Sequence, residues 1–236
     1  MRTKRWVAIG VTAFVVGSVA AMGTGPAAGE AQAAASFTTV IDNPYFPLPV
    51  GAKWVYRGVR DGVSQTDRVT VTSHTKVVDG ETILVVRDVA KHGTRLLEKT
   101  FDWYAQDDLG AVWYFGEDTA TYGPNGQVTS TEGSWTAGVD GAVRGIIMEA
   151  DPQVPDGYRQ EFYAGHAEDS AWVLSLDNAV TVPYGRVHHV LRTMEWSPLE
   201  PDVVDQKYYA QGIGIVKEIA VAGDQEVAKL VSFTTS

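Results

Sequence analysis

Two runs rich in aromatic and acidic residues, 101–106 and 112–118, hold the densest chemistry of the sequence. Residues 107–110 separate them and fit the loop of a β-hairpin. With that loop, Tyr104 faces Trp113 across the two strands. Side chains alternate between the two faces of a strand, so five of them share one face. They are Asp102, Tyr104, Trp113, Phe115 and Glu117.

Three carboxylates are the candidate catalytic groups: Asp102, Glu117 and Glu161. Asp102 and Glu117 become diagonal neighbours in this register, and Glu161 lies in a further aromatic run, 158–163. Paired carboxylates beside aromatic rings suit the acid–base chemistry of a carbohydrate hydrolase or lyase. The same groups could bind a divalent cation, or pair with arginines at a solvated surface. The sequence leaves these alternatives open.

Four aromatic side chains form the candidate wall of a ligand pocket: Tyr104, Trp113, Phe115 and Tyr209. A hairpin with large side chains on both faces must be covered on both, by core on one side and by a ligand, loop or second sheet on the other. Our first interpretation is a β domain that binds a small or apolar ligand here without catalysis. The second is the hydrolase or lyase, and packing alone is a third.

The sequence supports neither a cofactor nor a metal site. There is no cysteine, which excludes thiolate catalysis, zinc–thiolate centres and disulfides. His188 and His189 are adjacent, and adjacent strand residues point to opposite faces, so the two cannot ligate one ion from a regular strand. The nucleophile-elbow, phosphate-loop and His-Glu-x-x-His motifs are absent.

From Trp54 onward, short apolar or alternating runs are separated by Gly, Asp, Asn and Pro. This pattern is typical of strands joined by turns. Asp79-Gly80 and Asn125-Gly126 are pairs that accept the positive φ angles of tight hairpins. The sequence therefore predicts an all-β fold: a single antiparallel curved sheet, half-barrel or barrel, forming one domain over residues 36–236.

Residues 1–35 have the order of a secretory signal peptide. Basic residues come first, an uncharged apolar stretch spans residues 6–22, and small-x-small sites end at Ala33 and Ala35. We expect a secreted protein with no stable membrane anchor after cleavage. An uncleaved leader that anchors the chain is the alternative.

The formal net charge is −10 at pH 7. An acidic surface repels nucleic acid and anionic lipid, both of which need clustered Lys and Arg. We expect no nucleic-acid partner, and polyanions are disfavoured. Neutral or cationic small molecules remain as possible ligands.

Residues 43–56 read NPYFPLPVGAKWVY. They resemble the NPYFPL-x-x-G-x-x-W-x-Y stretch of uncharacterised exported bacterial proteins of actinobacterial type. Two later segments are similar to further motifs of these proteins: VPYGRVHHV at 182–190 and KYYAQGIGIV at 207–216. The resemblance implies a curved antiparallel sheet or half-barrel shaped like periplasmic lipid carriers. It implies no catalytic residue.

Overall fold

The computed structural model describes residues 36–223 and 225–235, and within them the chain forms strands and turns but no helix. The signal peptide predicted for residues 1–35 lies outside the described residues. The strands are β1 (Phe37–Thr38), β2 (Lys53–Arg60), β3 (Val63–Val78), β4 (Glu81–His92), β5 (Arg95–Asp107), β6 (Val112–Tyr122), β7 (Val128–Ser130), β8 (Trp135–Thr136), β9 (Val143–Met148), β10 (Gly157–Arg159), β11 (Glu161–Phe162), β12 (Ser170–Val182), β13 (Gly185–Trp196), β14 (Val204–Ala210), β15 (Gly214–Ala222) and β16 (Glu226–Thr234).

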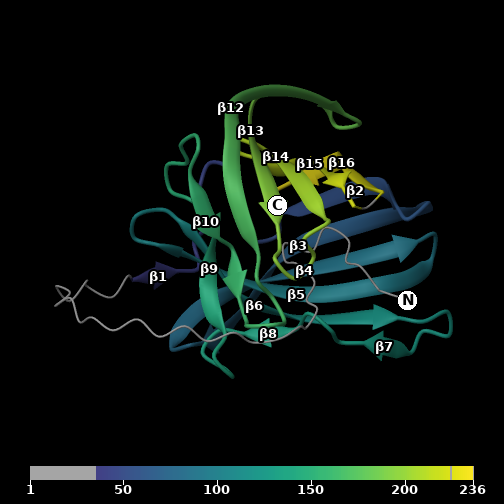
Figure 1. Cartoon of the computed structure of the whole chain (residues 1–236), viewed down its shortest axis with the longest axis horizontal. Helices are drawn as coiled ribbons and strands as arrows, with labels where there is room; N and C mark the ends of the chain where they lie inside the picture. Colours follow the sequence, from purple (N-terminus) through teal and green to yellow (C-terminus); the bar gives the residue numbers. More distant parts are fainter. Residues whose placement is uncertain (1–35, 224, 236) are drawn as a thin grey trace.

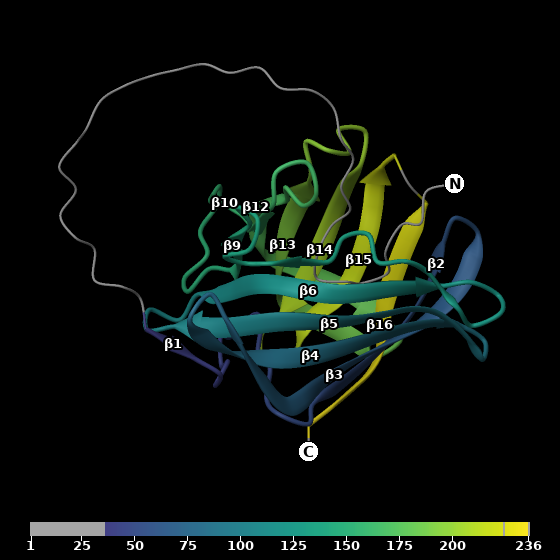
Figure 2. The ribbon, with the colours of Figure 1, turned by 90° about the horizontal axis from the view of Figure 1, so that it is seen from below.

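All the strands belong to one antiparallel sheet whose main path runs β10-β12-β13-β14-β15-β16-β2-β3-β4-β5-β6-β9-β11. The two strands at the ends of this path, β10 and β11, are separated in the chain by Gln160 alone. The sheet therefore curves until its edges nearly meet. Figures 1 and 2 show β3 to β6 as one wall, with β13 to β16 as the wall facing it. The predicted all-β, barrel-like fold is confirmed.

Alternation along the strands separates an inner face from an outer face. In β2, Trp54 and Tyr56 point inward and are buried, whereas Lys53 and Arg57 point outward and are exposed. Tight turns join the strands, and the predicted turn between β3 and β4 has φ angles of 50° at Asp79 and 82° at Gly80.

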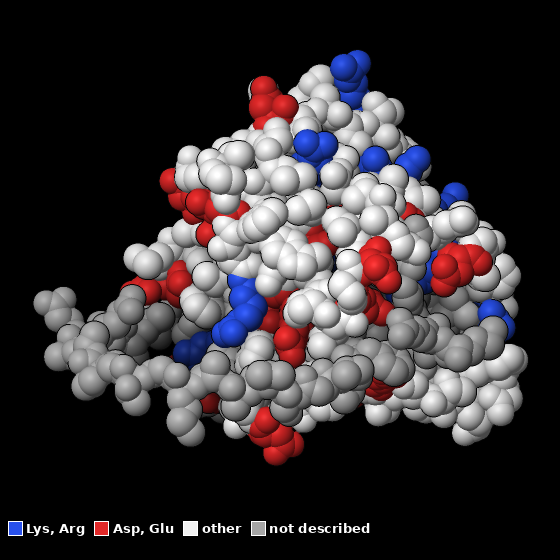
Figure 3. All heavy atoms as spheres, viewed as in Figure 1, with Lys and Arg blue, Asp and Glu red and all other residues white. Residues whose placement is uncertain are grey.

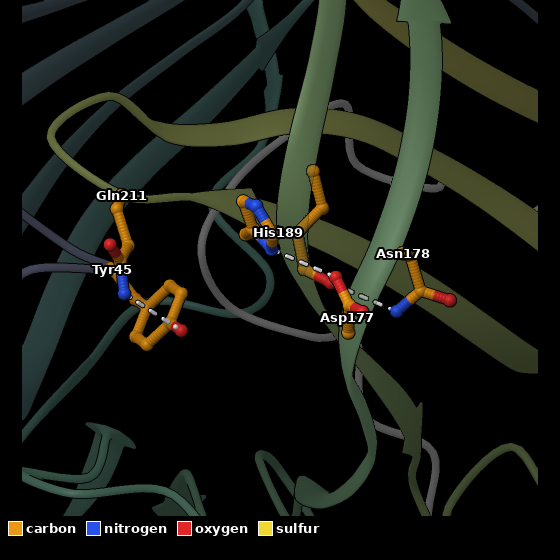
Figure 4. A network of polar contacts seen from close by, with 6 residues as sticks. Tyr45, Asp177, Asn178, His189 and Gln211 are labelled. Carbon is orange, nitrogen blue, oxygen red and sulfur yellow. Dashed lines mark hydrogen bonds and ion pairs between the residues drawn. The ribbon is translucent and has the colours of Figure 1, made fainter.

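Residues 41–49, which we call the strap, cross one end of the barrel. The Asn43 side-chain amide donates hydrogen bonds to the carbonyl oxygens of Gly110 and Glu149, at 2.9 Å each. At the other side of this end, the Gly212 N–H donates to the Pro44 carbonyl oxygen, at 2.8 Å. The Gln211 amide also reaches the Tyr45 hydroxyl, at 3.1 Å (Figure 4).

The strap also carries apolar side chains into the barrel. Phe46 and Leu48 are buried, and the Phe46 ring lies edge-on to the Tyr104 ring with centroids 5.4 Å apart. Trp54, at the start of β2, donates from its indole nitrogen to the Ile213 carbonyl oxygen at 2.7 Å. The motif that carries the family resemblance thus closes one end of the fold.

The register predicted for the β5–β6 hairpin is wrong. The turn closes with the Asp107 N–H donating to the Ala111 carbonyl oxygen, and the pairing then shifts at a bulge near Gly116. Gly116 has a φ of 123°, and a Cβ there would collide with the backbone of Trp135. As a result Tyr104 lies opposite Tyr114, and Trp113 lies opposite Ala105 on the outer face.

Candidate functional site

The inner face of the barrel is rich in acids. Carboxylates from six strands point inward and are buried: Asp67, Asp88, Glu98, Asp102, Glu117, Glu195 and Glu218. Two more come from β11 and the loop after it, Glu161 and Asp169. Among the described residues, the buried basic side chains are Arg60 and Lys207. Burying a charge is unfavourable unless it is paired or neutralised, so this excess of acids needs an explanation.

Asp102 and Glu117 lie directly opposite each other on β5 and β6, and both are 1% exposed. The Tyr114 hydroxyl donates to Asp102 Oδ1 at 2.9 Å, and the rings of Tyr104 and Tyr114 stack with centroids 5.0 Å apart. Burial, followed by the charges of these two carboxylates, raises the pKa of both tyrosine hydroxyls well above the usual value. Of the five residues predicted to share one face, Asp102, Tyr104 and Glu117 do so, whereas the register shift places Trp113 on the other face.

Glu161 joins this group from β11. The Trp135 indole donates to Glu161 Oε2 at 2.8 Å, and the Trp135 ring lies edge-on to Tyr114 with centroids 5.4 Å apart. Asp169 lies nearby, and burial together with the charge of Glu161 raises its pKa well above the usual range. The candidate carboxylates Asp102 and Glu161 therefore accept hydrogen bonds from two rings that contact each other, those of Tyr114 and Trp135 respectively.

Lys207 is the counter-ion of the opposite wall. Its Nζ lies 2.7 Å from Glu195 Oε2, and Glu195 Oε1 accepts from the hydroxyls of Tyr209 and Thr193. Burial alone would lower the pKa of Lys207, but the charges of Glu195 and Glu218 outweigh it and raise that pKa. Lys207 is therefore a permanent cation inside the barrel.

Asp67 and Asp88 form a buried carboxyl pair on β3 and β4. Burial raises the pKa of Asp67 to about 6 and that of Asp88 further above its usual range. The charge of Asp67 also raises the pKa of Asp88, so a single proton shared by the pair relieves the repulsion between the two carboxyl groups. Part of the acid excess is thus carried in neutral form.

A cleft of about 330 Å³ lies beside these groups. Aromatic, acidic and hydroxyl side chains line it together with one lysine: Lys76, Trp103, Glu117, Asp118, Ser134, Trp135, Thr136, Val139, Asp140 and Tyr163. The Lys76 ammonium lies over the Trp103 ring, 3.2 Å from its centroid. Glu117 is thus the one predicted site residue that borders the cleft. A second hollow against the strap is apolar and holds only about 20 Å³.

The predicted aromatic wall lies inside the packed core. Tyr104, Phe115 and Tyr209 are 0% exposed, while Trp113 is half-buried and donates from its indole nitrogen to Asp107 Oδ2 at 2.8 Å. None of the four lines the cleft of about 330 Å³. Their role in ligand binding stays a prediction. Sequence reasoning missed Trp135 and Tyr163, which reach the cleft from the short strand β8 and from the residue after β11.

The adjacent histidines lie at an irregular part of β13. His189 has a φ of 53°, and its Nδ1 lies 2.9 Å from Asp177 Oδ1 (Figure 4). Beside this pair, the Asn178 amide donates to the Val190 carbonyl oxygen at 2.9 Å, where the β12–β13 register shifts. Within residues 36–223 and 225–235, no group of three or more His, Asp and Glu side chains is placed to hold a metal ion. The same residues contain no helix that could cross a membrane.

No protein-family model matches the chain, and no curated protein matches it. Among solved structures, the chain is similar to a protein of Bacteroides fragilis described as exported, with a YmcC-like fold. The two share 13% identity with a TM-score of 0.47, over 82% of this chain and 100% of the other. The chain is also similar to a protein of Parabacteroides distasonis described as a lipoprotein. The two share 10% identity with a TM-score of 0.44, over 81% of this chain and 99% of the other. At these values the likeness carries no argument about function.

Proposed function

We propose that this chain is a secreted binding protein that holds a small ligand in the cleft beside Trp103 and Trp135 and performs no chemistry on it. The observation that carries the proposal is the cleft itself. Its volume of about 330 Å³ is at the lower end of the range for small-molecule sites. Three aromatic side chains and several polar ones converge on it, as expected for a site that fixes both the shape and the orientation of a ligand.

The lining favours a ligand with a polar edge and an apolar or cationic face. Trp103, Trp135 and Tyr163 offer rings, and Asp118, Asp140 and the hydroxyls of the 134–136 segment offer hydrogen-bond acceptors. Trp103 already holds an ammonium group, because Lys76 Nζ lies over its ring. Sugars and small quaternary amines both combine these properties, and either could displace Lys76 from the ring.

A hydrolase would need two carboxylates open to one substrate. Asp102 and Glu161 are 1% and 0% exposed, and both accept hydrogen bonds from aromatic side chains. Glu117 is the only one of the three that borders the cleft; Asp118 and Asp140 also line it, but neither is among the predicted acid–base groups. Buried and hydrogen-bonded in this way, the carboxylates support the interior of the barrel, and binding is the simpler function for the cleft.

Saturation-transfer NMR with glucose, N-acetylglucosamine and choline tests the proposal on the secreted protein. At least one probe should give transfer and should change the fluorescence of Trp103 and Trp135. Tyr163→Ala and Asp140→Asn should each weaken its binding by about tenfold or more, about 1.4 kcal/mol.

The matched control is Tyr184→Ala, which removes an exposed tyrosine at the β12–β13 turn and should leave affinity unchanged. If no probe binds, or if binding is insensitive to both cleft variants, the cleft is not the site. Turnover of a bound sugar would restore the hydrolase alternative.

A further inference from the structure

The outer face of the barrel carries a row of basic side chains that runs across seven neighbouring strands. Each residue of the row lies opposite the next on the adjacent strand. From β13 to β4 the row consists of Arg192, Tyr208, Lys217, Lys229, Arg57, Thr66 and Lys91. Five of its seven members are cations. We call it the outer row.

Like charges face each other directly in the outer row. Lys217 lies opposite Lys229, and Lys229 lies opposite Arg57. Directly opposed like charges destabilise a sheet, so packing within the chain gives no reason for this arrangement. The Arg192 Nε atom is in addition buried without a hydrogen-bond partner. An anion placed along the row would relieve both conditions.

In the described part of the chain, the strands of the row carry no acid at the outward positions directly next to it. The outward positions next to it on these strands carry apolar, amide or basic side chains: Met194, Gln206, Ile219, Val227, Val55, Val59, Arg68 and Val89. Asp67 and Glu218 on these strands point inward instead, next to the outward bases Arg68 and Lys217. In Figure 3, basic side chains gather along the upper right of the molecule, over the region of β16 and β2 in Figure 1.

Because buried acids and outward bases lie on opposite faces of the sheet, the net charge of −10 does not by itself predict which partners the outer face attracts. A net charge predicts repulsion of polyanions only when the charges are spread evenly over the surface. Here many of the acids lie inside the barrel, where protonation neutralises part of them, and the outer row is positive. The outer face of β2 to β4 and β13 to β16 therefore presents a row of positive charges although the net charge of the chain is negative.

We propose that the outer row binds a flexible linear polyanion, a chain with an anionic group on each repeat. Adjacent strands lie about 4.8 Å apart, so the seven members span about 29 Å around the barrel. Because the row follows a curved sheet, a flat bilayer would meet only its middle, whereas a flexible chain can follow all of it. Single-stranded nucleic acid would also need rings on which to stack its bases. The row offers only Tyr208, whose ring already has Lys217 Nζ 4.7 Å from its centroid.

The test uses end-labelled inorganic polyphosphate and fluorescence anisotropy. The protein should bind it at low salt, and log K should fall linearly with log salt concentration, with a slope of roughly 3 to 4 for about five contacts. The double variant Lys217→Gln/Lys229→Gln should weaken binding by about tenfold or more and lower the slope by about 1 to 2. It should fold normally, since it removes like-charge contacts.

Arg186→Gln is the matched control, because Arg186 is exposed at the start of β13 and lies outside the row. It should leave affinity and slope nearly unchanged. Equal effects of Arg186→Gln and the double variant would overturn the proposal, since binding would then follow total charge. Binding to phosphatidylglycerol vesicles without binding to polyphosphate would also overturn it, in favour of a membrane surface.

Discussion

The inner and outer faces of the same strands carry opposite charges. Inward positions on β3, β4 and β15 hold Asp67, Asp88 and Glu218, while the next residue along each strand or the one before it is a base that points outward. Outer cations keep their water, so each contributes little to stability. Inner acids have lost their water, and each must be protonated, paired with Lys207 or hydrogen-bonded to remain.

This difference shows that position in the pleat, rather than residue type, decides what a charge does in this fold. The inner face should respond strongly to substitution and to pH, and the outer face weakly. The predictions below measure that contrast from its largest effect to its smallest.

Removing the inner cation should have the largest effect. Lys207→Met leaves Glu195 and Glu218 buried without their counter-ion and should lower the free energy of unfolding by about 3 to 5 kcal/mol, measured by urea denaturation at pH 7.5. Lys229→Met makes the same change on the outer face and should stay within about 0.5 kcal/mol of the parent. Equal losses would remove the contrast between the faces. If Lys207→Met does not fold at pH 7.5, it should recover at pH 4.5, because burial raises the pKa of Glu218 and favours its neutral form there.

Stability should fall as the pH rises. Burial raises the folded-state pKa of Asp67 from 3.8 to about 6, and it also raises the pKa of Asp88, Asp169 and Glu218. The folded protein therefore binds more protons than the unfolded chain, and stability is lost as pH rises through the folded-state values. For Asp67 the window is about pH 4 to 6, and its share is at most about 3 kcal/mol. Urea midpoints between pH 5 and 8 measure this. A maximum near pH 7 would contradict it.

Replacing one member of the carboxyl pair should stabilise the protein. In Asp88→Asn, the amide can donate to Asp67 without a shared proton, and one buried acid is removed. We expect a gain of about 1 to 2 kcal/mol at pH 7.5 and a flatter pH dependence. The control is Asp108→Asn, at an exposed position in the β5–β6 turn. It should change neither the free energy of unfolding nor its pH dependence. A loss of stability in Asp88→Asn would mean that the shared proton holds the two strands together.

The smallest effect concerns the outer row. Lys229→Glu places an acid between Lys217 and Arg57 and should raise the unfolding free energy by about 0.2 to 1 kcal/mol. Lys53→Glu is the control, because Lys53 lies opposite Thr70 and Thr234 and has no opposed cation. Thermal melts of both variants at low salt measure the difference. If Lys229→Glu is destabilising, the opposed cations are not in conflict.

The sequence was sufficient to predict the class of fold, because its turn residues act locally. Asp79-Gly80 lies in a turn with positive φ at both residues, and Gly126 has a φ of 76°. The register of the β5–β6 hairpin was beyond such reasoning. It depends on where the Asp107 turn closes and on the bulge at Gly116, which Trp135 imposes from another part of the chain.

The candidate site was predicted only in part. Asp102 and Glu117 are close in sequence on one hairpin, so alternation placed them correctly on one face. Glu161 was also a candidate, but inner acids such as Asp67, Asp88 and Glu218 were missed because charged residues are expected outside. An acid next to a base within a strand, as in Glu98-Lys99, was the signal that could have found them. Adjacent strand residues point to opposite faces, so one member of each such pair must point inward. The cleft around Tyr163 depends on loop packing, which spacing does not encode.

The pairing of β16 with β2 has a consequence for how the barrel forms. Lys53 to Arg60 pair with Glu226 to Thr234, and the strap bonds to residues as far as 166 positions away. Contacts between such distant segments make folding slow, on the order of milliseconds to seconds, because a long loop must close before they form. Strand β16 pairs with β15 on one side and with β2 on the other. A chain cut before Glu226 therefore leaves one edge of β2 and one edge of β15 unpaired. Such a fragment should aggregate by edge-to-edge strand pairing.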